Sequence, residues 1–363
     1  CHTFNCSDCI LIGNRLMGKK IVTFGEVLLR LTPPNCLRIR QADSLIVKYG
    51  GSEANVAASL ANYGLDVEFV TRLPQNEVAE ACMGALRAIG IGTRHIIRGG
   101  DRLGIYFLED GASMRASRVV YDRAGSAFST IRPGMVDWER VFSDADWFHW
   151  SGIVPASSPE AAEVCMEAIE VADRMGLTIS CDLNYRKNLW KYGKTALEVM
   201  PAMVAKSDVI FGAMPEYKYT LGVEDVPFTA VDARYKLDEG AFLKECRLIE
   251  SKYPRCHKMF IELRNSLSVN HDILAAVLYS EGTLKVAPVY DIDHVVDKVG
   301  VGDAFVGGMI YGLVAYPDND RKALDFALAA SALKNTVYGD FNQVTVEEVE
   351  NLMNGNTSGR VSR

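Results

Sequence analysis

Short apolar runs alternate with amphipathic segments along most of this chain, and this alternation is typical of a parallel sheet covered by helices. The apolar, β-branched runs that predict buried strands are Lys20–Leu31, Val67–Thr71, Trp147–Ile153, Leu177–Leu183, Val209–Phe211 and Met259–Leu263. The segments that predict helices are Glu53–Tyr63, Asn76–Ala88, Ser158–Met175, Ala196–Ala205, Ala304–Tyr316, Arg321–Tyr338 and Val346–Met353. We therefore predict an α/β fold, with a mainly parallel sheet and helices on both of its faces.

Two hairpins interrupt this alternation. The first lies between Arg102 and Ser129, where two strand-like runs flank Asp110-Gly111, a pair that favours a tight hairpin turn. We interpret this hairpin as a lid that stands off the main sheet. The second hairpin is expected around Glu281-Gly282.

Two other stretches show no periodic pattern. Arg38–Lys48 is polar and irregular, and the chain from Phe211 to Pro254 is variable and polar. Ser52 is a good N-cap residue for the helix predicted from Glu53, because its hydroxyl can accept a bond from the first turn.

Composition narrows the possible partners. With 363 residues, the chain can bury a large core in one domain or two, and 48% hydrophobic with 23% charged residues is ordinary for a globular protein. The formal net charge of −7 gives no overall basic footprint for nucleic acid. No apolar run approaches the roughly 20 residues that span a bilayer. We expect a small-molecule partner.

The chain has nine cysteines, and their odd number and scattered spacing favour reduced, buried thiols and a cytoplasmic location. The exception is the N-terminus, which gathers Cys1, His2, Cys6 and Cys9. These residues could form a metal knuckle, but the Cys-x-x-Cys pair has no second pair at zinc-site spacing.

Residues 1–16 are interpreted as an extension outside the fold, because Met17-Gly18 is typical of a natural start and a strand follows it. The remaining chain is then one domain, residues 17–353. Its lid segments are expected near 33–49 and 102–129, and residues 354–363 are expected to form a flexible tail.

Gly300-Val301-Gly302-Asp303 has the clearest chemistry, at the start of the helix predicted from Ala304. Backbone N–H groups at a helix N-terminus lack intrahelical acceptors and lie at the positive end of the dipole, so they suit a phosphoryl group. A carboxylate there would repel an anion. We therefore expect Asp303 to take a proton from a hydroxyl as general base while the N–H groups hold the phosphate. The alternative is a glycine-rich turn in which Asp303 caps the helix.

Two further groups lie where ligands of α/β proteins bind. Gly50 and Gly51 would let a ligand approach the backbone at a helix N-terminus, and Asn55 offers donors and acceptors to a polyol. The alternative is a plain helix start with Asn55 facing solvent. Asp182-Leu183-Asn184-Tyr185-Arg186 follows a predicted strand, and alternate side chains of an extended exit share one side.

These motifs resemble those of the ribokinase-like (PfkB) carbohydrate kinases. The run Asp297–Asp303 is similar to the C-terminal signature Asp-Thr-x-Gly-Ala-Gly-Asp, with departures at Lys298 and Val301. Tyr49–Ala57 resembles the N-terminal signature Gly-Gly-x-x-x-Asn-x-Ala. The resemblance covers about residues 20–353. It implies a ribokinase-like three-layer α/β/α sandwich with a mainly parallel central sheet and a small β lid.

Two stretches resemble the 2-keto-3-deoxygluconate kinases of this family. The stretch that begins at Asp182 is similar to Asp-x-Asn-x-Arg-x-x-Leu-Trp, which related fructokinases share, and Tyr121–Ala127 to Tyr-x-Arg-x-Gly-Ser-Ala. Arg123 and Arg186 would suit a substrate carboxylate through bidentate hydrogen bonds, which a neutral ketose does not need. Either arginine could instead be structural, with Arg186 paired to Asp182 and Arg123 to Asp122.

The resemblance implies that ATP, with Mg²⁺, phosphorylates a sugar primary hydroxyl. The expected substrate is 2-keto-3-deoxygluconate, which would become its 6-phosphate, and the alternative is fructose or another ketose. Asp303 would be the base, and the N–H groups of Gly300, Val301 and Gly302 would form the anion hole. The implied substrate-binding residues are Gly50, Gly51, Asn55, Tyr106, Tyr121, Arg123, Arg186 and Asp340.

The resemblance also assigns residues to the nucleotide and the metal. Asn184, Arg264 and Ser266 are expected to bind ATP, the last two from a stretch that leaves a buried strand and in this family lies over the phosphates. Glu216 belongs to the family's Asn-x-x-Glu motif and is expected to serve the metal indirectly, with Ala213 in place of the asparagine. A homo-oligomer is expected.

Two other functions remain open from the sequence. A dinucleotide-dependent oxidoreductase would use Gly300-x-Gly302, but that fingerprint belongs after the first strand and here carries an aspartate where pyrophosphate would lie. A catalytically inactive sugar-binding relative is motivated by Ala213, Lys298 and Val301.

A chain that starts at Met17 is expected to keep the melting temperature and activity of the full sequence, because residues 1–16 show no core periodicity. Thermal melts and metal analysis of both proteins check this. Stoichiometric zinc in the longer chain, together with a large loss of stability on truncation, would contradict it.

Overall fold

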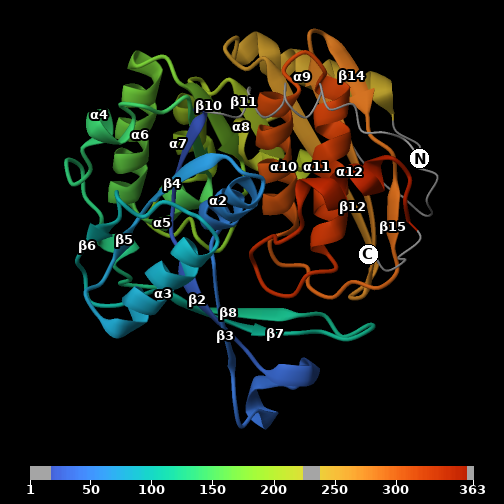
Figure 1. The fold of residues 1–363 in the computed structure, drawn as a ribbon. Helices are drawn as coiled ribbons and strands as arrows, with labels where there is room; N and C mark the ends of the chain where they lie inside the picture. The colour runs from blue at the N-terminus through green and yellow to red at the C-terminus, as the bar shows by residue number, and fades with distance from the viewer. Residues whose placement is uncertain (1–17, 224–237, 358–363) are drawn as a thin grey trace.

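The computed structural model describes residues 18–223 and 238–357, and a sheet of nine strands lies at its centre (Figure 1). Six neighbouring strands are parallel, in the order β4 (Asp66–Val70), β1 (Lys20–Phe24), β9 (Trp147–Ser151), β10 (Thr178–Asp182), β11 (Val209–Gly212) and β12 (Lys258–Ser268). Three antiparallel strands extend the sheet beyond β12, and these are β13 (His271–Ser280), β14 (Thr283–Val286) and β15 (Tyr290–Ile292). The predicted mainly parallel sheet is confirmed.

Helices cover both faces of this sheet. One face carries α2 (Ser52–Asn62), α3 (Glu77–Ala88), α10 (Val301–Ala315), α11 (Asp320–Lys334) and α12 (Val346–Met353). The other carries α4 (Trp138–Val141), α5 (Ile153–Ser157), α6 (Pro159–Arg174), α7 (Ala196–Val204), α8 (Met214–Leu221) and α9 (Glu239–Lys252). The predicted three-layer α/β/α sandwich is confirmed.

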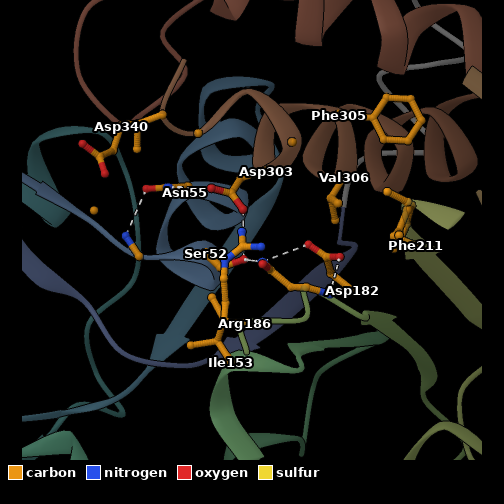
Figure 2. Close-up of a pocket in the computed structure, with 18 of the residues that line it drawn as sticks. Ser52, Asn55, Ile153, Asp182, Arg186, Phe211, Asp303, Phe305, Val306 and Asp340 are labelled. Carbon is orange, nitrogen blue, oxygen red and sulfur yellow. Dashed lines mark hydrogen bonds between the residues drawn. The ribbon is translucent and has the colours of Figure 1, made fainter. Parts of the chain in front are cut away.

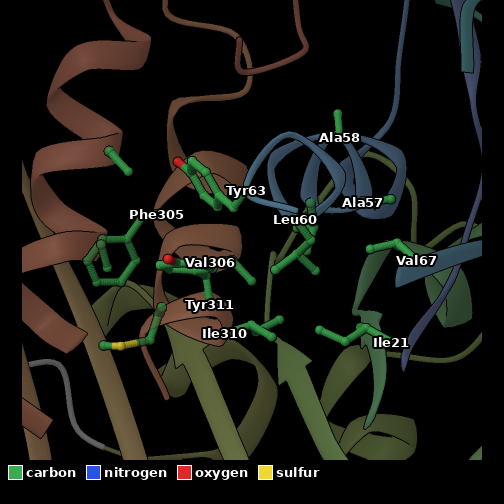
Figure 3. Close-up of a cluster of buried hydrophobic side chains, with 14 of the residues drawn as sticks. Ile21, Ala57, Ala58, Leu60, Tyr63, Val67, Phe305, Val306, Ile310 and Tyr311 are labelled. Atoms are coloured by element: carbon green, nitrogen blue, oxygen red, sulfur yellow. The ribbon is translucent and has the colours of Figure 1, made fainter. Parts of the chain in front are cut away.

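Helix α10 lies between α2 and α11 and is buried on most of its sides, as its apolar sequence predicts. Figure 3 shows its side chains meeting those of α2 above β1 and β4. This packing fixes the relative positions of the two helices that follow the two glycine motifs, because buried side chains interlock at close to crystalline density.

A second sheet of four strands stands off the first, in the order β3 (Ile46–Gly50), β2 (Leu28–Thr32), β7 (Ile105–Glu109) and β8 (Arg118–Asp122). The pairs β2–β3 and β7–β8 are antiparallel, and β2–β7 is parallel. The hairpin β7–β8 is the predicted one, so the β lid is confirmed as a structural element (Figure 1). The hairpin predicted around Glu281-Gly282 is also present, as β13–β14.

The prediction of a single strand over Lys20–Leu31 was wrong. The chain leaves the main sheet after Phe24, crosses at Gly25–Val27 and enters the lid as β2. The apolar pattern continues across the change of sheet because both strands are largely buried. Periodicity reports burial, so it does not mark the point where a chain passes from one sheet to another.

Both stretches without a periodic pattern contain regular elements. Arg38–Lys48 includes a 3₁₀ turn at Ile39–Gln41 and most of β3, a half-exposed edge strand that lacks the apolar alternation of a buried one. The stretch from Phe211 to Pro254 contains α8 and α9, and the Asp238 side chain caps α9. Residues 224–237 lie outside the described residues, as do the predicted extension 1–16 and the end of the predicted tail, 358–363.

Short elements complete the described ranges. β5 (Arg72–Leu73) and β6 (Ile97–Arg98) form a parallel pair, and further 3₁₀ turns lie at Pro34–Cys36 and Phe128–Thr130. Within residues 18–223 and 238–357, no helix is long and apolar enough to span a bilayer. The free cysteines there are buried except for Cys36.

Helices α10 and α11 approach each other closely at Gly312. A Cβ atom added there would lie 2.7 Å from Cα of Ala323, so the backbone of α11 would have to move. Gly312→Ala is therefore expected to lower the free energy of unfolding by about 1–3 kcal/mol, although alanine is the better helix former.

Gly84→Ala in α3 is the matched control, because a Cβ there meets open space. It should raise stability by roughly 0.5–1 kcal/mol through the lower conformational entropy of alanine. Urea denaturation of both variants measures the difference. Equal effects of the two substitutions would contradict the close contact between α10 and α11.

Candidate active site

A cavity of about 830 Å³ opens at the carboxyl ends of the parallel strands, between the main sheet and the lid. Its wall includes the lid residues Tyr106 and Tyr121, the start of α2 and the start of α10. Ligands of open α/β sheets bind at this edge. The two glycine motifs, separated by about 250 residues in the sequence, meet here because α2 and α10 pack side by side.

Asp303 lies where these helices meet, and two side chains of α2 donate hydrogen bonds to it. Ser52 Oγ donates to Oδ1 at 2.9 Å, and Asn55 Nδ2 donates to Oδ2 at 2.7 Å (Figure 2). Burial raises the pKa of Asp303, and the bonds from Asn55 and Ser52 offset part of that rise. The carboxylate is oriented and reaches the cavity, as a general base requires.

The predicted capping role of Ser52 was wrong. The N-cap of α2 is Gly51, and Ser52 is the first helical residue. Its hydroxyl instead donates to Asp303 and accepts from Asn184 Nδ2 at 2.9 Å. The serine is buried against two polar groups of other segments, so it bonds to them instead of closing its own helix.

Asn184 continues this chain of bonds to the end of β10. Its Nδ2 also lies 3.2 Å from Asp182 Oδ2, and its backbone is left-handed, with φ of 35°. The exit from β10 is therefore not extended as predicted, yet Asp182, Asn184 and Arg186 all line the cavity. Asparagine adopts this conformation more readily than most residues, and here it directs the amide toward α2.

The N-terminus of α10 has the predicted group of free backbone N–H donors. Gly300 is left-handed, with φ of 79°, and the first internal bond of the helix runs from Ala304 N to Gly300 O at 2.8 Å. The N–H groups of Gly300, Val301, Gly302 and Asp303 therefore have no acceptor within the helix. Gly300 and Gly302 line the cavity, so an anion can approach this end.

The lid places two tyrosines and an arginine over the cavity. Tyr106 is buried and Tyr121 is 53% exposed, with ring centroids 6.1 Å apart. Arg123 forms an ion pair with Glu26, which also accepts a bond from Ser126 Oγ at 2.6 Å. The structural pairing considered for Arg123 was with Asp122, but the structure pairs Asp122 with Arg102.

Arg186 is half exposed and lies 3.8 Å from Glu216, not against Asp182 as the structural alternative had it. Glu216 accepts the backbone N–H of Ala213 at 2.8 Å and that of Tyr185 at 3.1 Å, which ties the start of α8 to the exit of β10. Burial raises the pKa of both Glu216 and its neighbour Asp182. In the described ranges, no group of three or more His, Cys, Asp or Glu side chains is arranged to hold a metal.

The stretch expected to bind the nucleotide, which was said to leave a buried strand, is itself part of that strand. β12 continues to Ser268, and Arg264 lines the cavity, paired with Glu262 at 2.7 Å. Ser266 is exposed and is not part of the cavity wall, and its hydroxyl accepts from Lys298 Nζ at 3.4 Å. Lys298 stands where the family signature has threonine. It pairs with buried Asp272 at 2.6 Å.

Asp340 lies on the opposite wall from Asp182, next to Gly50 (Figure 2). It is 3% exposed, accepts a bond from Tyr106 Oη and pairs with Arg30 at 3.0 Å. Sequence reasoning missed Arg30, which is fully buried in β2. The available signal was a single arginine inside an apolar run.

Two buried acids were also missed. Glu26 lines the cavity and holds Arg123, and Glu53 lies behind Ser52 on α2. Ser151 at the end of β9 donates to Glu53, and burial raises the pKa of this carboxyl to about 7. Neither acid stands out in the sequence, because a glutamate at either position could equally well face solvent.

Comparison with known proteins gives consistent matches over nearly the whole chain. Residues 18–345 match the family described as pfkB family carbohydrate kinase. A 2-dehydro-3-deoxygalactonokinase of Haloferax volcanii is 32% identical over 346 residues, 94% of this chain and 99% of the relative. A 2-dehydro-3-deoxygluconokinase of Bacillus subtilis is 26% identical over 333 residues, 90% of this chain and 93% of the relative.

A solved structure is also similar. The crystal structure of a 2-dehydro-3-deoxygluconokinase from Thermotoga maritima superposes with a TM-score of 0.85 at 43% identity. The match covers 93% of this chain and 100% of that chain. The arrangement of main sheet, helices and lid is therefore shared along the full length of that structure.

Proposed function

This chain belongs to the PfkB family of carbohydrate kinases and is a sugar kinase, and from that premise we propose that its acceptor is a 2-keto-3-deoxy sugar acid with Asp303 as the general base. The predicted family is confirmed, and the dinucleotide-dependent alternative falls with it. The observation that carries the proposal is the position of Asp303. Its carboxylate is oriented by Ser52 and Asn55 beside the unpaired N–H groups of α10.

The proton transfer follows from that geometry. A sugar hydroxyl in the cavity donates to Asp303, which takes its proton as the hydroxyl oxygen attacks the γ-phosphorus of ATP. The bond from that phosphorus to the bridging oxygen breaks, and ADP leaves with that oxygen. Asn55 and Ser52 keep the carboxylate oriented by occupying one lone pair on each oxygen. The N–H groups of Gly300, Val301 and Gly302 face the charge that develops on the transferred phosphoryl oxygens.

Other residues in the cavity wall are suited to ATP and Mg²⁺. Arg264 and Asn184 are proposed for the nucleotide, and Arg264 brings a positive charge to the cavity wall. Ser266 remains a prediction from the family pattern. The carboxylates of Asp182 and Glu216 would supply oxygen donors of the kind that Mg²⁺ prefers, directly or through water. Bound Mg²⁺ would neutralise phosphate charge.

Two arginines support a carboxylate on the substrate. Arg123 comes from the lid and Arg186 from the β10 exit, and both line the cavity with Tyr106 and Tyr121. The Haloferax and Thermotoga relatives are named for 2-dehydro-3-deoxy sugar acids that differ in the parent sugar. The remaining proposed sugar contacts are Gly50, Gly51, Asn55 and Asp340.

A neutral ketose such as fructose is the second candidate, and one contact favours it. Glu26 already neutralises Arg123. Of these two arginines, only Arg186 lacks a close carboxylate partner, because its distance to Glu216 is 3.8 Å. A ketose would then use the same base and anion site. The two candidates differ in how much the lid arginine contributes.

Asp303→Asn is expected to lower kcat by about 10²–10⁴-fold while ATP still binds, because the amide accepts no proton. Burial raises the pKa of Asp303, so the wild-type kcat should rise with pH through an acidic limb above the ordinary aspartate range. That limb should vanish in Asp303→Asn. Coupled ADP release across pH measures both effects. A variant with more than a tenth of the wild-type rate would remove Asp303 from the chemistry.

Arg123→Ala is expected to lower kcat/KM for 2-keto-3-deoxygluconate by about 10- to 150-fold, since a charged hydrogen bond contributes roughly 1.5–3 kcal/mol. Fructose should be little affected. Both sugars are assayed on both proteins, with Arg102→Ala as matched control, because Arg102 pairs with Asp122 on the same hairpin outside the cavity. Equal losses on both sugars, or a wild type that prefers fructose, would favour the ketose assignment.

A further inference from the structure

Arg30 joins parts of the cavity that are far apart in the sequence. Its guanidinium is fully buried, lies 2.8 Å from Asp297 and 3.0 Å from Asp340, and donates from Nε to Thr32 at 2.9 Å. Its Cζ also lies 5.2 Å from the centre of the Tyr338 ring. One lid residue therefore binds the start of the α10 signature and the loop after α11.

Asp340 occupies the gap between the two glycine motifs. A Cβ added to Gly50 would lie 1.9 Å from Asp340 Oδ2, and one added to Gly300 would lie 2.1 Å from its backbone oxygen. Asp340 thus packs directly against the backbone of both glycines. Arg30 and Tyr106 donate to different carboxylate oxygens, which leaves one lone pair on each for a sugar hydroxyl.

Asp297 is the second carboxylate that pairs with Arg30, and it lies in the turn that precedes α10. Its Oδ1 accepts from Val299 N and its Oδ2 from Gly339 N, each at 2.9 Å. The first bond shapes the turn that leads to Gly300, and the second ties that turn to the residue before Asp340. A shift of Arg30 would therefore disturb both turns.

We propose that Arg30 is a positioning residue that aligns the sugar subsite at Asp340 with the phosphate subsite at the mouth of α10. Arginine suits this task because its planar fork reaches two carboxylates at once, while an ammonium group is a point charge. The inference rests on the proposed contact of Asp340 with the sugar. It is independent of which sugar the enzyme prefers.

The charges around Asp340 define a second readout. Burial raises the pKa of Asp340, and Arg30 and the bond from Tyr106 offset part of that rise. The ionisable groups of neighbouring segments that face Arg30 and Asp340 are Tyr106 and Asp110 of the lid hairpin, Asp297 and Asp303 of the signature, Lys334 of α11, and Tyr338 in the loop after it. Without Arg30, the pKa of Asp340 would rise further and the carboxyl would hold a proton at higher pH.

The test compares Arg30→Lys and Arg30→Gln with wild type, using whichever sugar wild type prefers. Arg30→Lys is expected to lower kcat/KM for the sugar by about 10- to 100-fold, with the KM for ATP within about threefold of wild type. In Arg30→Gln, the ratio of wild-type to variant kcat/KM should shrink as pH rises, because Asp340 regains its charge. Dividing by wild type removes the titration of Asp303.

The matched control is Arg255→Lys. Arg255 also bridges two carboxylates, Asp208 and Asp173, but it lies outside the cavity wall. It is expected to lose stability while both KM values and the pH profile remain at wild-type values. Thermal melts establish that each variant is folded before its kinetics are read.

A folded Arg30→Lys with wild-type sugar kcat/KM, or a loss shared equally with the KM for ATP, would overturn the proposal. If neither Arg30 variant folds, Asp297→Asn tests the phosphate side, since it removes one partner of Arg30 and keeps the other. Its kcat should fall while the sugar KM stays within about threefold of wild type. An unchanged kcat would overturn the proposal. Failure of the sugar-acid assignment would appear separately, as a wild-type preference for a ketose.

Discussion

The hydrogen bond between Asn55 and Asp303 is the contact on which the site depends, because it joins the first turns of two helices that the sequence separates by about 250 positions. It forms only if α2 and α10 lie side by side with their N-termini at the same edge of the sheet. The apolar packing of α10 against α2, and of α2 over β1 and β4, produces that arrangement (Figure 3). The geometry around Asp303 is thus a consequence of core packing, and small shifts between α2 and α10 would displace its carboxylate.

The wall of the cavity is rich in carboxylates. Asp182, Glu216, Asp303 and Asp340 all line it, and burial raises the pKa of each. Such a site would reject an anion if nothing opposed these charges. The N–H groups of α10 and the cavity arginines supply the opposing positive potential.

The two arginines that the lid brings close to the cavity are each paired with carboxylates. Arg30 is matched by Asp297 and Asp340, and Arg123 by Glu26. Burying a lone guanidinium would be strongly unfavourable, whereas a paired one can be kept close to a ligand at a modest cost. The exposed strand β8, by comparison, has no such partners in the core and places Tyr121 at the rim.

The sequence by itself determined the layers of the fold and both glycine motifs. Apolar periodicity reports burial, and most strands and helices bury one face, so their positions could be predicted. Apolar periodicity failed where a buried run passes from one sheet to another, as from β1 to β2. It also failed where a strand is half exposed, as in β3. The motif around Asp303 was visible because glycines at a helix start have few other uses.

Only the tertiary structure decided which polar groups face each other. Ser52 was expected to cap its own helix, but Gly51 is the N-cap, and the Ser52 hydroxyl bonds with Asp303 and Asn184. Arg30 and Glu26 could not be assigned from the sequence, since an ion pair is defined by distance in space and their partners lie about 100 to 310 residues away. Long-range pairing of buried charges leaves no local pattern, and for that reason the fold was more predictable than the site.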